Sequence, residues 1–318
     1  MDRRRIPLSD ASDLSMTSTI APVEERRNFG IGLLLFSQLF FATLDTSAKY
    51  LSFIGLPLGE IVFVRYAIHV VLAIALFLPL QRDLFVTRNW PLQLLRGLCL
   101  LGVTGANFLA MRFLPLTVTG ALMFTMPLMV TALSGPFLGE KIGWRRWAAV
   151  GAGFIGILII VRPGTEAFHP ASLICLAGAL SAAFYSIITR KLAGVDSAAT
   201  QQVYSGLIAL TCITPFAFND WVWPSTGAGW FAFVAIGVTG MIAHQLNTIA
   251  HRYAPPSALA PFSYTELLLL ALASWLIFSE PPDVWFYVGA PIIIGSGVYI
   301  WLRERQLHRT VTVTAVED

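Results

Sequence analysis

Long apolar stretches, separated by short breaks rich in proline, glycine or charge, fill the chain between residues 30 and 302. A membrane core about 30 Å thick needs about 20 helical residues at about 1.5 Å each, so each stretch can cross it once. Lipid offers an open backbone no hydrogen-bond partners, and helices are therefore the predicted form of every stretch. The ten predicted spans are residues 30–52, 58–80, 92–113, 116–138, 145–162, 170–190, 200–218, 227–249, 256–278 and 284–302.

Composition supports a membrane protein with several spans. Hydrophobic residues make up 56% of the 318 residues and charged residues only 12%, whereas soluble domains are about a quarter charged. Residues 1–29 are polar and predict a disordered cytoplasmic tail, and the polar residues 303–318 predict a second tail. The net charge of +3 comes without a basic block, so no nucleic-acid partner is expected. The three cysteines are an odd number without CxxC spacing, which favours a packing role.

Lysine and arginine predict the orientation, because they are enriched in cytoplasmic loops. With the N-terminus in the cytoplasm, the cytoplasmic side holds Arg3, Arg4, Arg5, Arg26, Arg27, Arg82, Arg88, Arg96, Lys141, Arg145, Arg146, Arg190, Lys191, Arg252, Arg303, Arg305 and Arg309. The outer side then holds only Lys49, Arg112 and Arg162. Both termini are therefore predicted to lie on the cytoplasmic side of the cell inner membrane.

A repeated pattern divides the chain into two halves. Residues 107–115 read NFLAMRFLP and residues 247–255 read NTIAHRYAP, and matched residues are 140 positions apart. The spacing persists to the glutamates after the following helices, which indicates duplication. The matched pairs are Asn107 and Asn247, Ala110 and Ala250, Arg112 and Arg252, Pro115 and Pro255, and Glu140 and Glu280.

The two copies are predicted to lie in opposite orientations, because five helices is an odd number. The loop GEKIGWRRW at 139–147 then faces the cytoplasm, whereas its counterpart SEPPDVW at 279–285 faces outward and has lost every Lys and Arg. Inverted repeats of this kind are common in secondary transporters, which bind substrate near the membrane midplane between the repeats.

Four motifs carry a resemblance to a known family. They are LGEK at 138–141, FSEP at 278–281, GEIVFVRY at 59–66 and TMPLM at 125–129. In this order, and with the duplication, the chain resembles the EamA type of the drug/metabolite transporter superfamily. The resemblance implies an all-α integral membrane protein with ten transmembrane helices, built as two inverted five-helix EamA repeats at residues 30–163 and 170–302. The second copy departs from the pattern, because Leu267 stands where Pro127 stands in the first.

A narrower resemblance concerns the substrate. The opening helix and the stretch PFSYTELLLLALASWLIFSEPPD at 261–283 are similar to bacterial EamA-type riboflavin importers. The implied function is riboflavin uptake by alternating access. The expected partners are the small-molecule substrate and the bilayer, and the sequence does not indicate an oligomeric state. Amino-acid or metabolite export or import, including S-adenosylmethionine uptake, remains the alternative within the superfamily.

Ionisable residues inside the spans are functional candidates, since burying them in lipid costs a few kcal/mol each. Glu266, in the ninth span, is interpreted as a proton carrier or a partner for a polar substrate group; the alternative is a neutral or paired buried carboxyl. Asp45 and Lys49 share a helix face, which fits either an internal ion pair or the outer mouth of the route. Arg65 either attracts an anionic group or neutralises a carboxylate, and His69 one turn later is favoured as a packed interior histidine.

Uncharged interior residues complete the candidate substrate site. They are Gln38, Tyr185, Tyr264, Gln245 and Asn247. The residues expected to be structural are Asn107, Arg112, Arg252, Glu140, Glu280 and Pro127. The asparagines are predicted to build the turns after the third and eighth spans, the arginines to extend to opposite surfaces, and the glutamates to cap the following helices.

Other classes of protein lack their motifs in this sequence. There is no HExxH, no GxSxG and no P-loop, so neither an enzyme nor an ATP-driven carrier is expected. No cofactor and no metal are expected. A channel or a membrane receptor without transport remains the alternative from a different class, although no filter-like loop or ring of charges is present.

Overall fold

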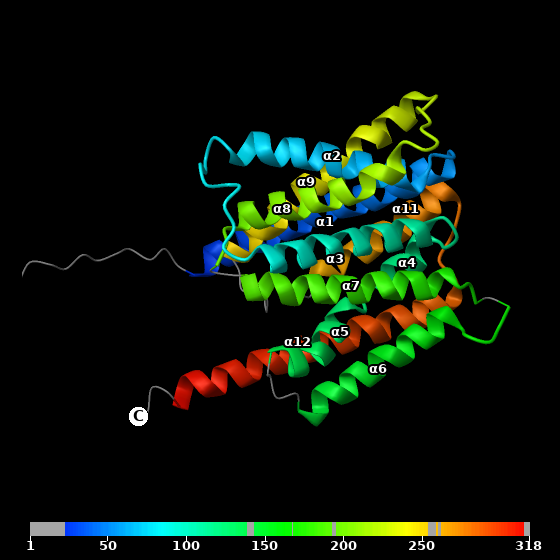
Figure 1. Cartoon of the computed structure of the whole chain (residues 1–318). Coiled ribbons are helices and arrows are strands. Elements are labelled where there is room, and N and C mark those ends of the chain that lie inside the picture. Colours follow the sequence, from blue (N-terminus) through cyan, green and yellow to red (C-terminus); the bar gives the residue numbers. More distant parts are fainter. Residues whose placement is uncertain are drawn as a thin grey trace, which may run out of the picture.

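The structure, a computed structural model, describes residues 23–138, 143–166, 168–192, 195–253, 259 and 262–314, and every regular element in these residues is a helix. The elements are α1 (Val23–Phe53), α2 (Leu58–Phe77), α3 (Trp90–Met111), α4 (Leu116–Met123), α5 (Met126–Leu138), α6 (Trp144–Val161), α7 (Ala171–Leu192), α8 (Ala198–Ala217), α9 (Gly227–Tyr253), α11 (Thr265–Phe278) and α12 (Val284–Thr314). They form an elongated bundle in which α1 begins and α12 ends at the same end (Figure 1). We call this the terminal end and the other the opposite end.

The helices have the length and polarity of membrane spans. Eight helical segments are long and apolar enough to cross a bilayer, and α11 is a shorter apolar helix. Helix α8 has 20 residues but is less apolar, because its first turn contains Thr200, Gln201 and Gln202. Together these elements account for the ten predicted spans, and the chain is a multi-pass membrane protein.

The fourth predicted span, residues 116–138, is broken. Helix α4 ends at Met123 and α5 begins at Met126, with Pro127 in its first turn. Proline fits there because the first turn of a helix leaves its backbone N–H groups unbonded. At the break, the carbonyl of Leu122 accepts from both the backbone N–H of Thr125 over 3.1 Å and its side-chain hydroxyl over 2.6 Å. The expectation of a proline inside a continuous helix was therefore wrong.

Helix packing exchanges between the two halves as a two-fold repeat requires. Helix α1 packs on α9, and its counterpart α7 packs on α3; α2 also contacts α9, and its counterpart α8 contacts α3. The counterparts α2 and α8 pack on each other, as do α6 and α12. At the α6–α12 crossing, a Cβ added to Gly156 would come within 2.9 Å of the Gly289 carbonyl oxygen, and the reverse distance is 2.7 Å. Small residues thus let these two backbones touch.

The first and last helices are longer than predicted. Helix α1 begins at Val23 rather than residue 30, and α12 continues to Thr314 rather than residue 302. The added segments contain Glu, Arg, Gln and Leu, which favour helix in water as well as in lipid. Hydropathy marks the edge of the membrane, whereas a helix ends where its backbone hydrogen bonding stops.

Candidate functional site

A buried arginine connects α3 with α7 and α8. The side chain of Arg96 is 5% exposed. Its Nε donates to the hydroxyl of Thr189 over 2.8 Å, Nη1 to the carbonyl of Gln201 over 2.5 Å, and Nη2 to the hydroxyl of Tyr185 over 2.5 Å. Nη1 also donates to the hydroxyl of Ser205. The guanidinium lies 4.4 Å from the centre of the Tyr185 ring. All these partners are neutral, so the positive charge of Arg96 is solvated but not neutralised.

Arg96 lines a cavity of about 340 Å³ between the two halves. The cavity extends from the α7–α8 connection at the terminal end to two histidines, His69 of α2 and His244 of α9, whose ring centres are 6.1 Å apart. Its lining is His69, Arg96, Leu100, Tyr185, Thr189, Asp196, Ala198, Gln201, Gln202, Ser205, His244 and Thr248. The lining is mostly polar and contains the rings of Tyr185, His69 and His244, so it offers a small organic molecule both hydrogen bonds and ring contacts.

Unpartnered polar atoms lie beside this cavity. His69 is 4% exposed, and its Nδ1 has no hydrogen-bond partner among the described residues. Arg65, one turn earlier on α2, is 5% exposed, and its Nε and Nη1 also lack partners within the described part of the chain. Its guanidinium lies 4.4 Å from the Tyr66 ring centre. Buried polar groups are nearly always hydrogen-bonded, so these atoms indicate a place where a ligand or water completes the structure.

An acidic cluster lies between α1, α3 and α11. The amide of Asn107 donates to Asp45 over 3.5 Å, and its oxygen accepts a weak contact from the Cys175 thiol at 3.9 Å. Asp45 is close enough to both Arg65 and Glu266 for their charges to interact. Asn107 therefore faces the protein interior, and the prediction that it builds the α3–α4 turn was wrong.

Glu266 lies in the first turn of α11, not in the middle of a long helix as predicted. With the 140-residue offset, Glu266 corresponds to Met126, the first residue of α5, so the starts of α5 and α11 differ by only one residue. In secondary transporters, interrupted helices whose N-terminal ends point inward commonly form the substrate site.

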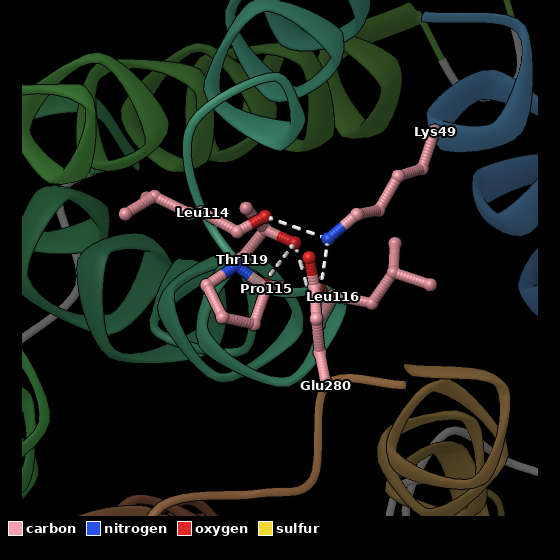
Figure 2. Close-up of polar contacts among 6 residues, drawn as sticks. All are labelled: Lys49, Leu114, Pro115, Leu116, Thr119 and Glu280. Atoms are coloured by element: carbon pink, nitrogen blue, oxygen red, sulfur yellow. Dashed lines mark hydrogen bonds and ion pairs between the residues drawn. The ribbon is translucent and has the colours of Figure 1, made fainter. Parts of the chain in front are cut away.

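Another buried cation, Lys49, lies at the opposite end. Figure 2 shows the ammonium of Lys49, on α1, between the carboxylate of Glu280 and the carbonyl of Leu114, which accepts a hydrogen bond of 3.1 Å. Lys49 is 6% exposed. Glu280 comes from the α11–α12 connection and Leu114 from the α3–α4 connection, so one ammonium joins the two halves. These residues line a second cavity of about 470 Å³.

This contact corrects two predictions. Lys49 pairs with Glu280 rather than with Asp45, because α1 turns its ammonium toward the loops of the opposite end. Glu280 does not cap α12; instead the carboxylate of Asp283 accepts from the backbone N–H of Trp285 over 3.4 Å. Asp283 is also bound by Nη2 of Arg162 over 2.5 Å, an exposed ion pair at the same end.

The remaining candidates are spread along the interior. Gln38 is buried on α1 with an unpartnered Oε1 within the described residues, and Gln245 and Asn247 are half-buried on α9. The Tyr264 ring lies 5.2 Å from that of Phe124, at the two helix breaks. Arg112 is exposed, and its Nη2 donates to the carbonyl of Leu56 over 2.6 Å. Glu140 and the side chain of Arg252 lie outside the described residues.

Sequence reasoning missed the place of Arg96. It was counted among the cytoplasmic cations, although Gln93 lies three residues earlier on the same face of an apolar helix. Gln93 is also buried, and its amide donates to Asp196 over 2.8 Å. A polar face within an apolar helix is the signal that would have placed Arg96 inside the protein.

Comparison with known proteins places this geometry in a family. The EamA-like transporter family matches the chain twice, at residues 28–162 and 169–302. The riboflavin transporter of Vibrio cholerae serotype O1 is 34% identical over 287 residues, which cover 87% of this chain and 94% of that protein. The S-adenosylmethionine uptake transporter of Rickettsia felis is 30% identical over 278 residues, 87% of this chain and 94% of that protein.

A solved crystal structure shares the fold, with a TM-score of 0.62 and 20% identity over 87% of this chain and 98% of that one. The repeated match and the bundle with exchanging contacts agree, and the predicted duplication is confirmed. The chain belongs to the EamA-like transporter family.

Proposed function

We propose that this protein carries riboflavin into the cell by alternating access. The cavity beside Arg96, with its mixture of aromatic rings and fixed polar groups, is the observation that carries the proposal. A relative named a riboflavin transporter, 34% identical over most of the chain, supports the choice of substrate. A flavin presents a flat ring system with carbonyl and ring-nitrogen acceptors and a chain of hydroxyl groups. Tyr185 and the two histidines offer rings for stacking, and Arg96 offers donors.

The difference between the terminal end and the opposite end supports the assignment of this structure to one state of the transport cycle. The 340 Å³ cavity reaches the terminal end, while the Lys49 contact joins the two halves at the opposite end. A cavity of about 470 Å³ lies beside the Lys49 contact, so our assignment rests on the contact across the halves and not on cavity size. With both termini in the cytoplasm, as lysine and arginine predict, this arrangement corresponds to the inward-facing state. The outward-facing state then requires the Lys49 contact to break and the Arg96 side to close.

S-adenosylmethionine is the second candidate substrate. Its sulfonium and amino groups are positive, and the carboxylates of Asp45 and Glu266 near the helix breaks would attract them. A relative named an S-adenosylmethionine uptake transporter, 30% identical over 278 residues, supports this alternative. The same Glu266 is our candidate for proton coupling.

The test is uptake of radiolabelled riboflavin by cells that lack both flavin synthesis and their own importer. Cells that express the chain should show saturable uptake that flavin analogues compete, and cells with an empty vector should not. Labelled S-adenosylmethionine is measured in parallel. Saturable S-adenosylmethionine uptake without riboflavin uptake, with the protein present in the membrane, would replace the first substrate with the second.

A further inference from the structure

Arg96 has no ion-pair partner among the described residues: Asp196, a carboxylate that lines the same cavity, accepts its hydrogen bonds from Thr87, Arg88 and Gln93 instead. Arg96 and Arg65 are both 5% exposed, and both act electrostatically on His244. The partners of Arg96 are hydroxyl groups and a carbonyl. Arg65 has only the Asp45 charge nearby, without an ion pair between the described residues. A buried cation without a matching anion is costly, and a negative or acceptor-rich ligand lowers that cost.

Three residues that line the cavity carry polar hydrogens or nitrogens without a partner among the described residues. A guanidinium has five N–H groups, and the four hydrogen bonds of Arg96 leave one N–H on Nη2 unused. The hydroxyl of Tyr185 accepts from Arg96, so its own hydrogen is free to donate. The unpartnered Nδ1 of His69 adds a third donor from the α2 side in the tautomer that is protonated at Nδ1.

We infer that Arg96, Tyr185 and His69 form a subsite for the acceptor edge of a flat, uncharged or anionic solute, such as a ring with two carbonyl groups, and that this subsite rejects cations. The inference rests on the proposed function in taking this cavity as the substrate site. It assigns the selection between riboflavin and S-adenosylmethionine to the positive charge of Arg96 on α3. Asp45 and Glu266 then serve the cycle rather than substrate selection.

The experiment measures ligand binding to the purified full-length protein in detergent, separately from uptake. The probes are lumiflavin, which has the flavin ring without the hydroxyl chain, and S-adenosylmethionine as the cation. We expect the unaltered protein to bind lumiflavin and not S-adenosylmethionine. Arg96→Gln should weaken lumiflavin binding about 10-fold or more, since hydrogen bonds from charged donors are the strongest.

A second variant guards against misfolding of Arg96→Gln. Tyr185→Phe keeps the ring and removes only the hydroxyl, and we expect lumiflavin binding to weaken about 3- to 10-fold. Its matched control is Tyr204→Phe, which removes a hydroxyl that donates to the carbonyl of Phe85 outside the cavity over 2.7 Å. The control should bind lumiflavin as the unaltered protein does.

Several results would overturn the inference. The first is that Tyr185→Phe and a folded Arg96→Gln both bind lumiflavin as tightly as the unaltered protein does. The second is that the unaltered protein binds S-adenosylmethionine but not lumiflavin. The third is that the unaltered protein binds neither probe. Lumiflavin binding that both variants weaken, without riboflavin uptake by cells, would uphold the subsite and remove the proposed substrate. The two failures are therefore distinguishable.

Discussion

The two ends of this transporter each bury a cation, but they do so in different ways. Lys49 at the opposite end is neutralised by Glu280, and the pair joins the two halves. Arg96, on the side of the terminal end, is held by neutral oxygens from α7 and α8 and keeps its charge exposed to a cavity. A paired charge favours a closed contact, whereas an unpaired one favours a ligand. On the proposed function, Lys49 therefore closes one end of the route and Arg96 selects what enters at the other.

Breaking the Lys49 pair is expected to have the largest effect. Glu280→Gln leaves a buried ammonium without its counter-charge, and we expect the free energy of unfolding to fall by about 2 kcal/mol, because Glu280 is partly exposed and fully buried pairs lose about 3–5 kcal/mol. Thermal unfolding in detergent measures the change, and riboflavin uptake should fall with it. The double variant Lys49→Met with Glu280→Gln should regain much of the lost stability. Equal losses in the single and double variants would show that the pair does not act as a unit.

The second largest effect is expected for uptake in a variant of Glu266, which lies between the two ends. Glu266→Gln keeps the shape of the side chain but cannot carry a proton, so we expect uptake to fall about 10-fold and to lose its dependence on pH. Lumiflavin binding should remain within about twofold of the unaltered value if Arg96 selects the ligand. A variant with the full uptake rate and an unchanged pH profile would remove Glu266 from proton coupling.

The exposed ion pair at the opposite end should matter much less than the buried one. Arg162 and Asp283 are bound over 2.5 Å, but their side chains are 30% and 45% exposed. Arg162→Gln should therefore cost about 0.5 kcal/mol or less and leave uptake unchanged. The test compares the thermal unfolding of Arg162→Gln with that of Glu280→Gln under the same conditions. A loss as large as that of Glu280→Gln would mean that the whole loop surface, and not the Lys49 contact, holds this end closed.

The smallest expected effect lies at the mouth of the Arg96 cavity, in the α7–α8 connection. Burial raises the pKa of Asp196, but hydrogen bonds from the Arg88 N–H, Thr87 and Gln93, with the Arg88 charge, outweigh it and leave the pKa below its ordinary value. A lowered pKa stabilises the folded state above the unfolded pKa of about 3.9, and this stability is lost as the pH falls through the folded pKa.

Asp196→Asn should therefore lower the unfolding temperature by about 1 °C or less at pH 7, and the difference from the unaltered protein should shrink in acid. Thermal unfolding at pH 7 and below pH 4 measures it. A difference that is constant with pH would assign the effect to lost hydrogen-bond geometry rather than to charge.

The sequence predicted the large-scale organisation because that organisation follows from local composition. Apolar length gave the spans, and the 140-residue spacing gave the duplication. The break before α5 and the inward-facing Asn107 were missed, because a proline or an asparagine is compatible with several local structures. Lys49 and Glu280 are 231 residues apart, and no periodic pattern connects them. Arg96 was misplaced because counting cations along a chain ignores the face of the helix on which each one lies.

The contact of Gly156 with Gly289 limits how the molecule can move. Two backbones that already touch can turn against each other, but they cannot approach further. We therefore expect the α6–α12 crossing to act as a fulcrum, and a small rotation there becomes a larger displacement at the more distant helices α1, α2, α8 and α9. The two glycines would then limit the size of the conformational change without contacting the substrate.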